Sequence, residues 1–457
     1  MRSNTNSFRS MIMKFNKKFK YIPMQAIISN SNKPMCKGCK KVYKLNCIKI
    51  FIAIFIVVLI YFIIAKKLND SSFKIENITC NSYSPCYNLR SSKSMPIILG
   101  WNNLVDNHNI MDIQTGLYNT DECKYECEYT TNKDLYMNAT AIIFHIRAEH
   151  KKLPKIRFSN QLYVFFLDES PFYTWDYFKD VPNNFFNITM TYRVDSDIYY
   201  PYDIFIPCNG KCHVDEYWSE KEVLEKVRRK NRLAMKAYSD CVTPSRRENL
   251  VAELGKLIKI DLYGNCPGTT KCDTSYCLNQ ELANHMFYMA FENSVCKNYI
   301  TEKFWYLKHL IVPVVLSRRV FRQTKIPDNV YIAVDDFNTV EELAEYLLYL
   351  QKNKTAYLKY FDWTKTYRKT TYRQGYYKYS PLGRQSYINA LNASYAPAYN
   401  PICNLCELAH KHNKKQQRHI IRNIWNYWIS KHICIDNWSD IWLKGKIEKV
   451  YKRSKWQ

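Results

Sequence analysis

Carboxylate, amide, phenol and ammonium side chains are concentrated between two apolar runs, residues 287–291 and 311–316. They are Glu292, Asn293, Tyr299, Glu302 and Lys303. A lysine in the first turn of a helix is poorly placed for the helix dipole unless it faces an anion. A diphosphate would supply that anion, and Glu302 could hold ribose or sugar hydroxyls. The pattern predicts a nucleotide-sugar pocket; the alternative is a solvated helix start with an Asn or Thr cap.

The elements around these groups follow from length and composition. Residues 287–291 and 311–316 have the length of strands, and residues 299–309 between them have the length of a short helix. This order predicts a β-α-β unit of a buried parallel sheet. The reactive groups would then lie at the carboxyl end of a strand, where open α/β sheets bind ligands.

The same stretch resembles the signature of the α1,3-fucosyltransferase family. The resemblance rests on FYMAFENS, NYITEKF and VPVVL, in that order, within residues 287–316. It implies an α/β fold of the GT-B type, with two Rossmann-like domains facing a cleft, and GDP-fucose as donor. It also implies that Glu292, Asn293, Tyr299, Glu302 and Lys303 bind the donor, with a catalytic role for Glu302. One departure is Lys308 to Ile311, which replaces a small Ala-Gly pair common in the family.

A second group of polar residues follows predicted strands at 96–101, 141–147 and 161–167. The third strand leads into Asp168-Glu169-Ser170-Pro171, which resembles the family's Glu-Ser-Pro motif. An inverting transfer needs a carboxylate within hydrogen-bond reach of the acceptor hydroxyl, to take its proton. We predict that Glu169 is this catalytic base and contacts the acceptor, with Asp168 as the alternative.

Further acceptor and donor contacts are implied by the resemblance. His145 and Arg147 match a family strand at the acceptor site, where Ile146 replaces a second histidine. Tyr192 and Arg193 belong to the next family block and are expected to line the donor side of the cleft. In the same block Asp203 stands where members often have glycine.

The donor half is expected to begin with a strand at 232–240 and to continue with one at 258–264. Arg247 lies between them and resembles the family's diphosphate-binding arginine, with the adjacent Arg246 as the alternative. Together with Lys303 it would neutralise the charge that develops on GDP as the fucosyl bond lengthens.

A competing interpretation concerns metal chemistry. Asp195-Ser196-Asp197 has the spacing with which GT-A glycosyltransferases hold Mn²⁺ against a diphosphate. In a GT-B site, basic side chains and a helix amino terminus replace the metal. We therefore predict no metal ligands and no obligatory cofactor, and allow that Mn²⁺ stimulates activity.

The amino-terminal region predicts a membrane anchor. Residues 50–65 are sixteen uninterrupted apolar residues, about 24 Å as a helix, and twelve basic residues precede them. Positive charge before the span keeps that side cytosolic. About half of the formal charge of +26 lies in residues 1–67, so this part of the charge is topogenic and we expect no nucleic-acid partner. These features predict a single-pass type II Golgi membrane protein with a luminal catalytic part.

We expect six parts along the chain. They are a basic cytosolic tail (1–49), a transmembrane signal anchor (50–65), a stem (66–95), an acceptor-side domain (96–220), a GDP-fucose-binding domain (221–400) and a basic, cysteine-containing C-terminal segment (401–457).

Cysteines and sequons agree with a luminal location. Fourteen of the seventeen cysteines follow the predicted anchor. Cys403 and Cys406 resemble the family's C-terminal CxxC, which implies bridges to cysteines elsewhere in the catalytic domain; zinc is the lesser alternative. Six candidate N-glycosylation sites follow the anchor, namely Asn77, Asn138, Asn187, Asn353, Asn392 and Asn437.

The function predicted from these features is transfer of L-fucose from GDP-fucose, with inversion, to the 3-hydroxyl of GlcNAc in glycoprotein or glycolipid glycans. Two alternatives stay open: a membrane-anchored glycan-binding or inactive homologue, and a metal-dependent GT-A transferase. The sequence leaves the acceptor undecided among LacNAc, LacdiNAc and the N-glycan core.

Overall fold

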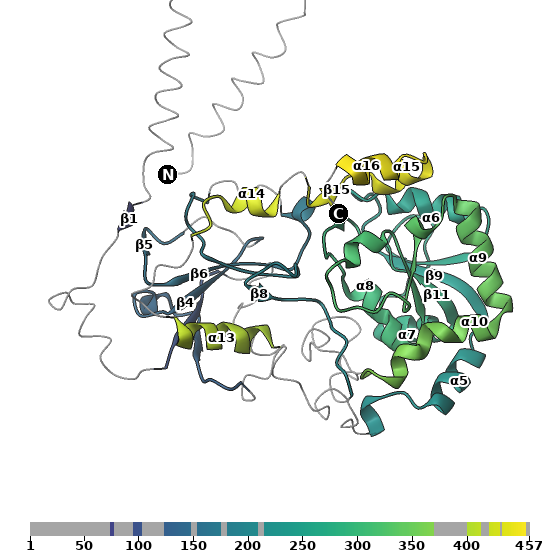
Figure 1. Cartoon of the computed structure of the whole chain (residues 1–457), viewed down its shortest axis with the longest axis horizontal. Helices are drawn as coiled ribbons and strands as arrows, with labels where there is room; N and C mark the ends of the chain where they lie inside the picture. The colour runs from purple at the N-terminus through teal and green to yellow at the C-terminus, as the bar shows by residue number, and fades with distance from the viewer. Residues whose placement is uncertain are drawn as a thin grey trace, which may run out of the picture. The chain divides into compact units, whose positions relative to one another are not determined.

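The computed structural model describes residues 74–76, 95–102, 123–147, 153–174, 181–208, 214–369, 400–412, 420–429 and 432–453. Its architecture is α/β, with two larger sheets whose paired strands all run parallel (Figure 1). The predicted fold class is therefore confirmed at this level. Among the described residues no helix is long and apolar enough to cross a membrane, and the predicted anchor lies outside them.

The first sheet has the order β3-β2-β4-β6-β7-β8. Its strands are β2 (Ile97–Gly100), β3 (Glu128–Thr130), β4 (Ala141–His145), β6 (Leu162–Leu167), β7 (Ile188–Thr191) and β8 (Ile198–Tyr199). Side chains alternate between two cores, since Ala141 and Ile143 face one and Ile142 and Phe144 the other. The sheet is therefore buried on both faces, as expected for a parallel sheet.

The second sheet has the order β10-β9-β11-β13-β14. Its strands are β9 (Arg232–Tyr238), β10 (Ile260–Gly264), β11 (His285–Met289), β13 (Val312–Val315) and β14 (Ile332–Ala333). The helices that share its core include α5 (Glu220–Arg228), α6 (Arg247–Gly255), α7 (Ser275–Asn284), α9 (Val340–Lys352) and α10 (Lys354–Leu358). One continuous apolar core joins them.

The predicted central β-α-β unit is present, with a shorter helix. β11 pairs in parallel with β13, and between them lie α8 (Glu302–Trp305) and a 3₁₀ turn, Tyr306–His309. Thr301 caps α8, because its side chain accepts a hydrogen bond from the Lys303 amide. The turn ends at Leu310, a buried leucine with φ of 58°, where the family's glycine would be less strained.

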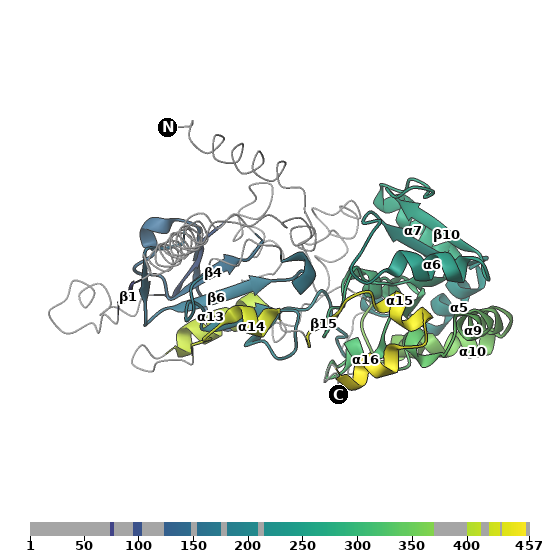
Figure 2. The ribbon, with the colours of Figure 1, turned by 90° about the horizontal axis from the view of Figure 1, so that it is seen from above.

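The C-terminal segment packs on both sheets. α13 (Pro401–Lys411) and α14 (Ile424–Trp428) contribute to opposite faces of the first sheet, as Figure 1 shows. Figure 2 shows the same helices from above. β15 (Cys434–Ile435) pairs with β12 (Val295–Cys296), and α15 (Trp438–Leu443) and α16 (Ile447–Arg453) join the core of the second sheet. This segment, which the sequence pattern left uninterpreted, is thus a structural part of both halves.

One strand lies inside the predicted stem. β1 (Lys74–Glu76) pairs in parallel with β5 (Ile156–Phe158). At least this piece of residues 66–95 is therefore joined to the body that follows. The predicted cytosolic tail lies outside the described residues, and the domain limits stay predictions.

Both predicted disulfide candidates are bridged, Cys403 to Cys123 and Cys406 to Cys127. These bonds fix α13 to the segment before β3, and they leave neither sulfur free for the alternative zinc site. Among the described residues that follow the first sheet, three further bridges are present: Cys241–Cys266, Cys272–Cys277 and Cys296–Cys434.

The candidate glycosylation sites differ in accessibility. Asn138 is exposed, whereas Asn353 and Asn437 are half-buried. Asn187 does not fit the prediction, because it is 6% exposed and its side-chain amide bonds the Tyr163 amide and the Gln161 carbonyl within the sheet. Asn77 and Asn392 lie outside the described residues.

Candidate active site

Glu169 follows β6, at the carboxyl end of a central strand of the first sheet. Its Oε1 accepts hydrogen bonds from the Ser170 amide, at 2.6 Å, and from the Tyr299 hydroxyl. Its Oε2 lies 3.6 Å from an Arg147 guanidinium nitrogen, and both side chains are partly exposed, 19% for Glu169 and 24% for Arg147. The carboxylate is therefore held by three donors while it keeps access to solvent, as a general base requires.

The other predicted acceptor residue, His145, has a different environment. It is 5% exposed, and its ring packs edge-on against Phe166 at 5.4 Å between centroids. Its backbone amide and carbonyl both bond the side chain of Asn102, at 2.9 Å. Of the predicted pair, the structure brings Arg147 to Glu169, while His145 is fixed in the end of its strand.

The segment after β11, residues 292–303, which we call the donor loop, supplies a compact charged cluster. Lys303 Nζ lies 2.7 Å from Glu302 Oε1, 3.4 Å from Glu292 Oε2 and 3.0 Å from Thr301 Oγ1. Burial alone would lower the pKa of Lys303, but attraction to the two carboxylates outweighs it and raises the pKa. The anion that Lys303 faces here is thus supplied by the protein's own carboxylates.

The two carboxylates of this cluster, Glu292 and Glu302, differ in the direction of their pKa shifts. Burial raises the pKa of Glu292, which also accepts bonds from the Thr301 amide at 2.7 Å and the Thr301 hydroxyl at 2.8 Å. For Glu302, burial acts in the same direction, but Lys303 outweighs it and lowers the pKa. Glu292 therefore shapes the loop, and the more exposed Glu302 is the better placed of the two to contact a ligand.

Arg247 is the first residue of α6 and is 2% exposed. Its Nη1 donates to the Phe291 carbonyl at 2.9 Å and its Nη2 to the Asp240 carbonyl at 3.2 Å. Within the described residues it forms no ion pair with a carboxylate, and its Nε has no hydrogen-bond partner. A buried cation without a carboxylate partner is a strong candidate for binding an anion.

The alternative arginine, Arg246, points elsewhere. It has φ of 54°, and its Nε donates to Asn437 Oδ1 at 3.0 Å. Arg247, by contrast, is bonded directly to the carbonyl that precedes Glu292. The structure therefore favours Arg247 over Arg246 beside the donor loop.

Asn293 and Glu292 also connect the donor loop to the turn before α6. The Ser245 amide donates to the Asn293 carbonyl at 2.9 Å, and the Ser245 hydroxyl donates to the Glu292 carbonyl at 2.7 Å. These bonds hold the loop next to Arg247. The side-chain oxygen of Asn293 is buried and has no hydrogen-bond partner among the described residues.

Tyr192 and Arg193, both predicted to bind the donor, are buried and contact other parts of the protein. Arg193 is 4% exposed; its Nε and Nη2 contact Asp195 at 2.8 and 2.6 Å, and its Nη1 donates to the Tyr427 carbonyl at 2.8 Å. Tyr192 is 1% exposed and packs between Tyr299 and Trp428. In this structure Arg193 connects the first sheet to the C-terminal segment, and Tyr192 packs against Tyr299. Their donor-binding role stays a prediction.

The aspartates of the possible metal motif are bonded to different protein groups. Asp195 pairs with Arg193 and lies 3.6 Å from Lys297. Asp197 Oδ2 accepts from the Thr189 amide and hydroxyl, each at 2.8 Å. Their role in this structure is therefore to organise the segment after β7.

Lys236, on β9, was missed by the sequence analysis. Its side chain is fully buried, and its Nζ donates to the carbonyls of Met289 and Phe291 at 3.1 and 3.2 Å. Burial, with Arg247 and Lys303 nearby, lowers its pKa well below the usual range. A lysine within an otherwise apolar strand was the available signal.

Two side-chain hydrogen bonds join the Glu169 turn to the donor loop. One is the bond from Tyr299 to Glu169, and the other links the hydroxyls of Ser170 and Ser294 at 2.9 Å. The predicted base and the predicted donor residues thus meet in one site, although they follow strands of different sheets.

Two family models match most of the described chain. Residues 93–203 match the model "Fucosyltransferase, N-terminal", and residues 227–427 match "Glycosyltransferase family 10 (fucosyltransferase) C-term". The alpha-(1,3)-fucosyltransferase fut-5 of Caenorhabditis elegans is 35% identical over 271 residues, which cover 54% of this chain and 67% of that protein. The chain belongs to glycosyltransferase family 10, the fucosyltransferases.

Other relatives of this family-10 chain match over similar regions. The alpha-(1,3)-fucosyltransferase C of Drosophila melanogaster is 33% identical, covering 54% of this chain and 62% of the relative. The human 4-galactosyl-N-acetylglucosaminide 3-alpha-L-fucosyltransferase FUT6 is 34% identical, covering 53% and 66%. A crystal structure of an alpha1,3-fucosyltransferase with GDP-fucose aligns at 17% identity and a TM-score of 0.41, covering 64% of this chain and 86% of that one. That similarity is too low to add to the assignment.

Proposed function

We propose that this chain is an inverting α1,3-fucosyltransferase of the GT-B type, which moves L-fucose from GDP-fucose to the 3-hydroxyl of GlcNAc in a glycan. The observation that carries the proposal is the contact between Glu169, at the end of a first-sheet strand, and Tyr299 of the donor loop. A base and the donor loop must lie this close if a proton is to leave the acceptor as the glycosyl bond breaks.

In the proposed reaction, the acceptor oxygen forms a bond to the anomeric carbon of fucose as the bond from that carbon to the phosphate oxygen breaks. Glu169 takes the acceptor proton. Arg247 stabilises the charge that appears on the GDP leaving group, since it has no carboxylate partner among the described residues. Lys303 contributes less net charge because two carboxylates flank it, and Glu302 is available to hold donor hydroxyls.

The names of the relatives support transfer to the 3-hydroxyl of the acceptor, but one relative is named for transfer to a 4-hydroxyl. Human FUT6 is named a 3-alpha-L-fucosyltransferase, while the similarly related Bos taurus FUT3 is named a 3-galactosyl-N-acetylglucosaminide 4-alpha-L-fucosyltransferase. The chain spans 67% of fut-5 and 55% and 63% of the next two C. elegans relatives. The linkage is therefore the first property to measure.

We further propose that the catalytic part lies in the Golgi lumen, behind a type II anchor at residues 50–65. The five disulfides among the described residues support an oxidising compartment, where such bonds form and persist. Detection of an epitope at the C-terminus only after the Golgi membrane is permeabilised would agree with this topology. Detection from the cytosolic side of intact Golgi membranes would contradict it.

The test of function is fucose transfer by the full-length protein from GDP-fucose to LacNAc, LacdiNAc and N-glycan core acceptors, with the product linkage determined by NMR. We expect an α1,3-linked product on at least one acceptor. Folded protein that binds GDP or a glycan but forms no product would favour the alternative of an inactive, glycan-binding homologue. An α1,4 linkage would keep the enzyme class and overturn the predicted acceptor hydroxyl.

A further inference from the structure

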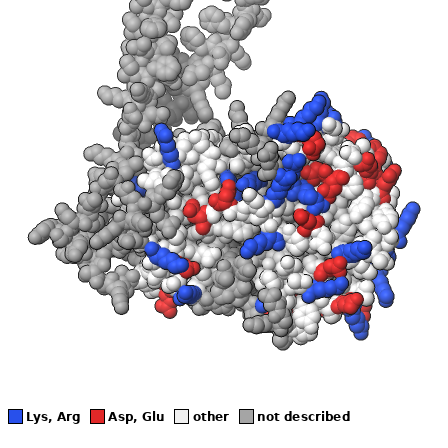
Figure 3. Space-filling model, viewed as in Figure 1, with Lys and Arg blue, Asp and Glu red and all other residues white. Residues whose placement is uncertain are grey.

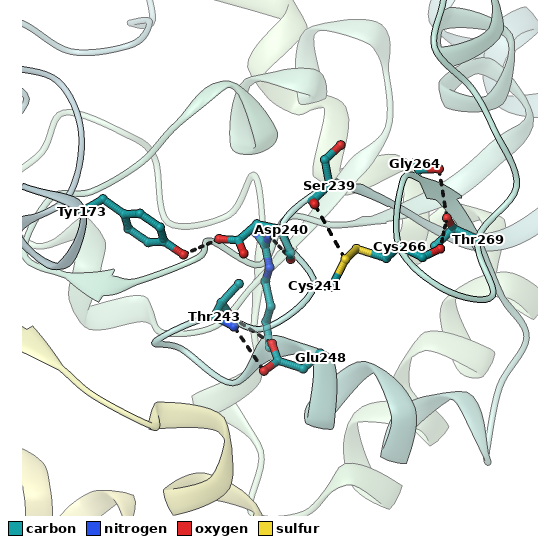
Figure 4. The surroundings of a disulfide bond; sticks show 10 residues. Tyr173, Ser239, Asp240, Cys241, Thr243, Glu248, Gly264, Cys266 and Thr269 are labelled. Atoms are coloured by element: carbon teal, nitrogen blue, oxygen red, sulfur yellow. Dashed lines mark hydrogen bonds between the residues drawn. A yellow bond between two sulfur atoms is a disulfide. The ribbon is translucent and has the colours of Figure 1, made fainter. Parts of the chain in front are cut away.

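Tyr173 is a tyrosine of the first half that reaches a carboxylate of the second. It ends the 3₁₀ turn Pro171–Tyr173, four residues after Glu169, and its hydroxyl donates a hydrogen bond to Asp240 Oδ2 (Figure 4). The charges of Asp240, Arg247 and Glu169 all act on this hydroxyl. Burial, followed by the bond to Asp240, raises the pKa of Tyr173, so the hydroxyl stays protonated and remains a donor.

Asp240 lies in the turn between β9 and α6, directly beside the arginine of the donor site. Its backbone carbonyl accepts a hydrogen bond from Arg247 Nη2 at 3.2 Å, whereas its side chain is bonded to Tyr173. The next residue, Cys241, is bridged to Cys266 after β10, and Figure 4 shows this bond beside the Tyr173 contact. The disulfide holds the backbone of the turn in place. A change of partner for the Asp240 carboxylate therefore needs only a rotation of its side chain.

The second carboxylate near this turn is also occupied. Glu248 Oε1 accepts from the Thr243 amide at 3.2 Å, and Glu248 Oε2 accepts from the Thr243 hydroxyl at 2.9 Å (Figure 4). Two carboxylates thus lie within seven residues of Arg247 in the chain, yet each is directed to a different partner. An arginine between carboxylates normally pairs with one of them, because the pair is stronger than bonds to backbone carbonyls.

We propose that Tyr173 is a positioning residue whose hydroxyl holds the Asp240 carboxylate away from Arg247, so that the guanidinium remains available to the donor diphosphate. This inference rests on the proposed function, in which Arg247 binds GDP. It assigns to the acceptor half of the chain a residue that controls donor affinity.

The experiment measures GDP affinity by calorimetry for the full-length protein in detergent, so that it does not depend on turnover. In Tyr173→Phe the Asp240 carboxylate loses its donor and pairs with Arg247, and we expect GDP to bind about tenfold more weakly, because a competing buried ion pair must be broken. The double variant Tyr173→Phe/Asp240→Asn has no carboxylate to pair and should recover wild-type affinity to within about threefold. Tyr276→Phe, at a tyrosine 71% exposed on α7, is the matched control and should bind as wild type does.

If the wild-type protein binds GDP, any one of three results would overturn the inference. They are unchanged affinity in Tyr173→Phe, weak binding that persists in the double variant, and weakened binding in Asp240→Asn alone. Failure of the wild-type protein to bind GDP would instead overturn the donor assignment in the proposed function, and this inference with it. The rescue by Asp240→Asn separates positioning from a general loss of folding, which a second substitution would not repair.

Discussion

The hydroxyl of Tyr299 donates a hydrogen bond to the carboxylate of Glu169, across 130 residues of sequence. Tyr299 is 2% exposed and packs on Tyr192, so its ring has little freedom. We expect Tyr299→Phe to lower kcat about tenfold. The lost hydrogen bond orients the charged carboxylate, and its loss should raise the activation free energy by about 1.4 kcal/mol. GDP affinity of Tyr299→Phe should change less than kcat does. A variant with wild-type kcat would show that the bond does not orient the base.

Asp203 and Lys308 stand at two positions where the sequence departs from the family pattern, and the structure joins them. Lys308 Nζ lies 2.9 Å from each Asp203 oxygen, and the two side chains are 2% and 3% exposed. Removing one partner leaves a buried charge, so Lys308→Met should cost about 3–5 kcal/mol of unfolding free energy. Chemical denaturation measures this cost.

The matched control for Lys308 is Lys365→Met, which breaks an exposed pair with Asp362 and should leave the unfolding free energy nearly unchanged. The double variant Asp203→Asn/Lys308→Met should cost at least about 1 kcal/mol less than the sum of its single changes. Additive costs would mean that Asp203 and Lys308 contribute to stability independently. The two departures from the family pattern would then not be coupled in energy.

The sequence predicted those parts of the site that local patterns encode. The β-α-β unit and the strand before Glu169 follow from apolar run lengths, and parallel strands bring their carboxyl ends to one edge. The bond from Tyr299 to Glu169 depends on how two sheets meet, which no local pattern contains. The burial of Arg193 was not predictable either, because one of its partners is Tyr427, which lies 234 residues later in the C-terminal segment.

Lys236 gives the protein a predictable pH dependence. Its pKa is lowered well below 10.5, first by burial and then by Arg247 and Lys303, so the unfolded chain binds a proton that the folded chain holds weakly. Stability should therefore rise with pH until the unfolded lysine titrates near 10.5. Between about pH 7 and pH 9, the Tm of wild type should rise relative to that of Lys236→Met.

The control for Lys236 is Lys259→Met, at a lysine whose side chain is 83% exposed. Its Tm should stay parallel to that of wild type over the same range. Parallel curves for Lys236→Met as well would show that Lys236 keeps its proton in the folded protein, stabilised by the carbonyls of Met289 and Phe291.

The partners of Asp195 and Asp197 predict how the protein responds to metal removal. Because Arg193 and Thr189 already occupy these carboxylates, EDTA should leave GDP affinity within about twofold. Asp195→Asn should act on stability instead, since it leaves the buried Arg193 guanidinium without its carboxylate. Because Asp195 itself is 39% exposed, the cost should lie between those of a surface and a buried pair, at about 1–3 kcal/mol. A tenfold loss of GDP affinity in EDTA, restored by Mn²⁺, would support the metal-dependent alternative.

The central claim is that Glu169 supplies the base while a separate group of residues binds the donor. It is tested most directly by measuring turnover and GDP affinity of Glu169→Gln beside wild type, with GDP-fucose and the best acceptor. We predict that kcat falls by about 10²–10⁴-fold, the usual contribution of a general base, while GDP affinity stays within about threefold. Turnover close to that of wild type, or a parallel loss of GDP binding, would contradict the account.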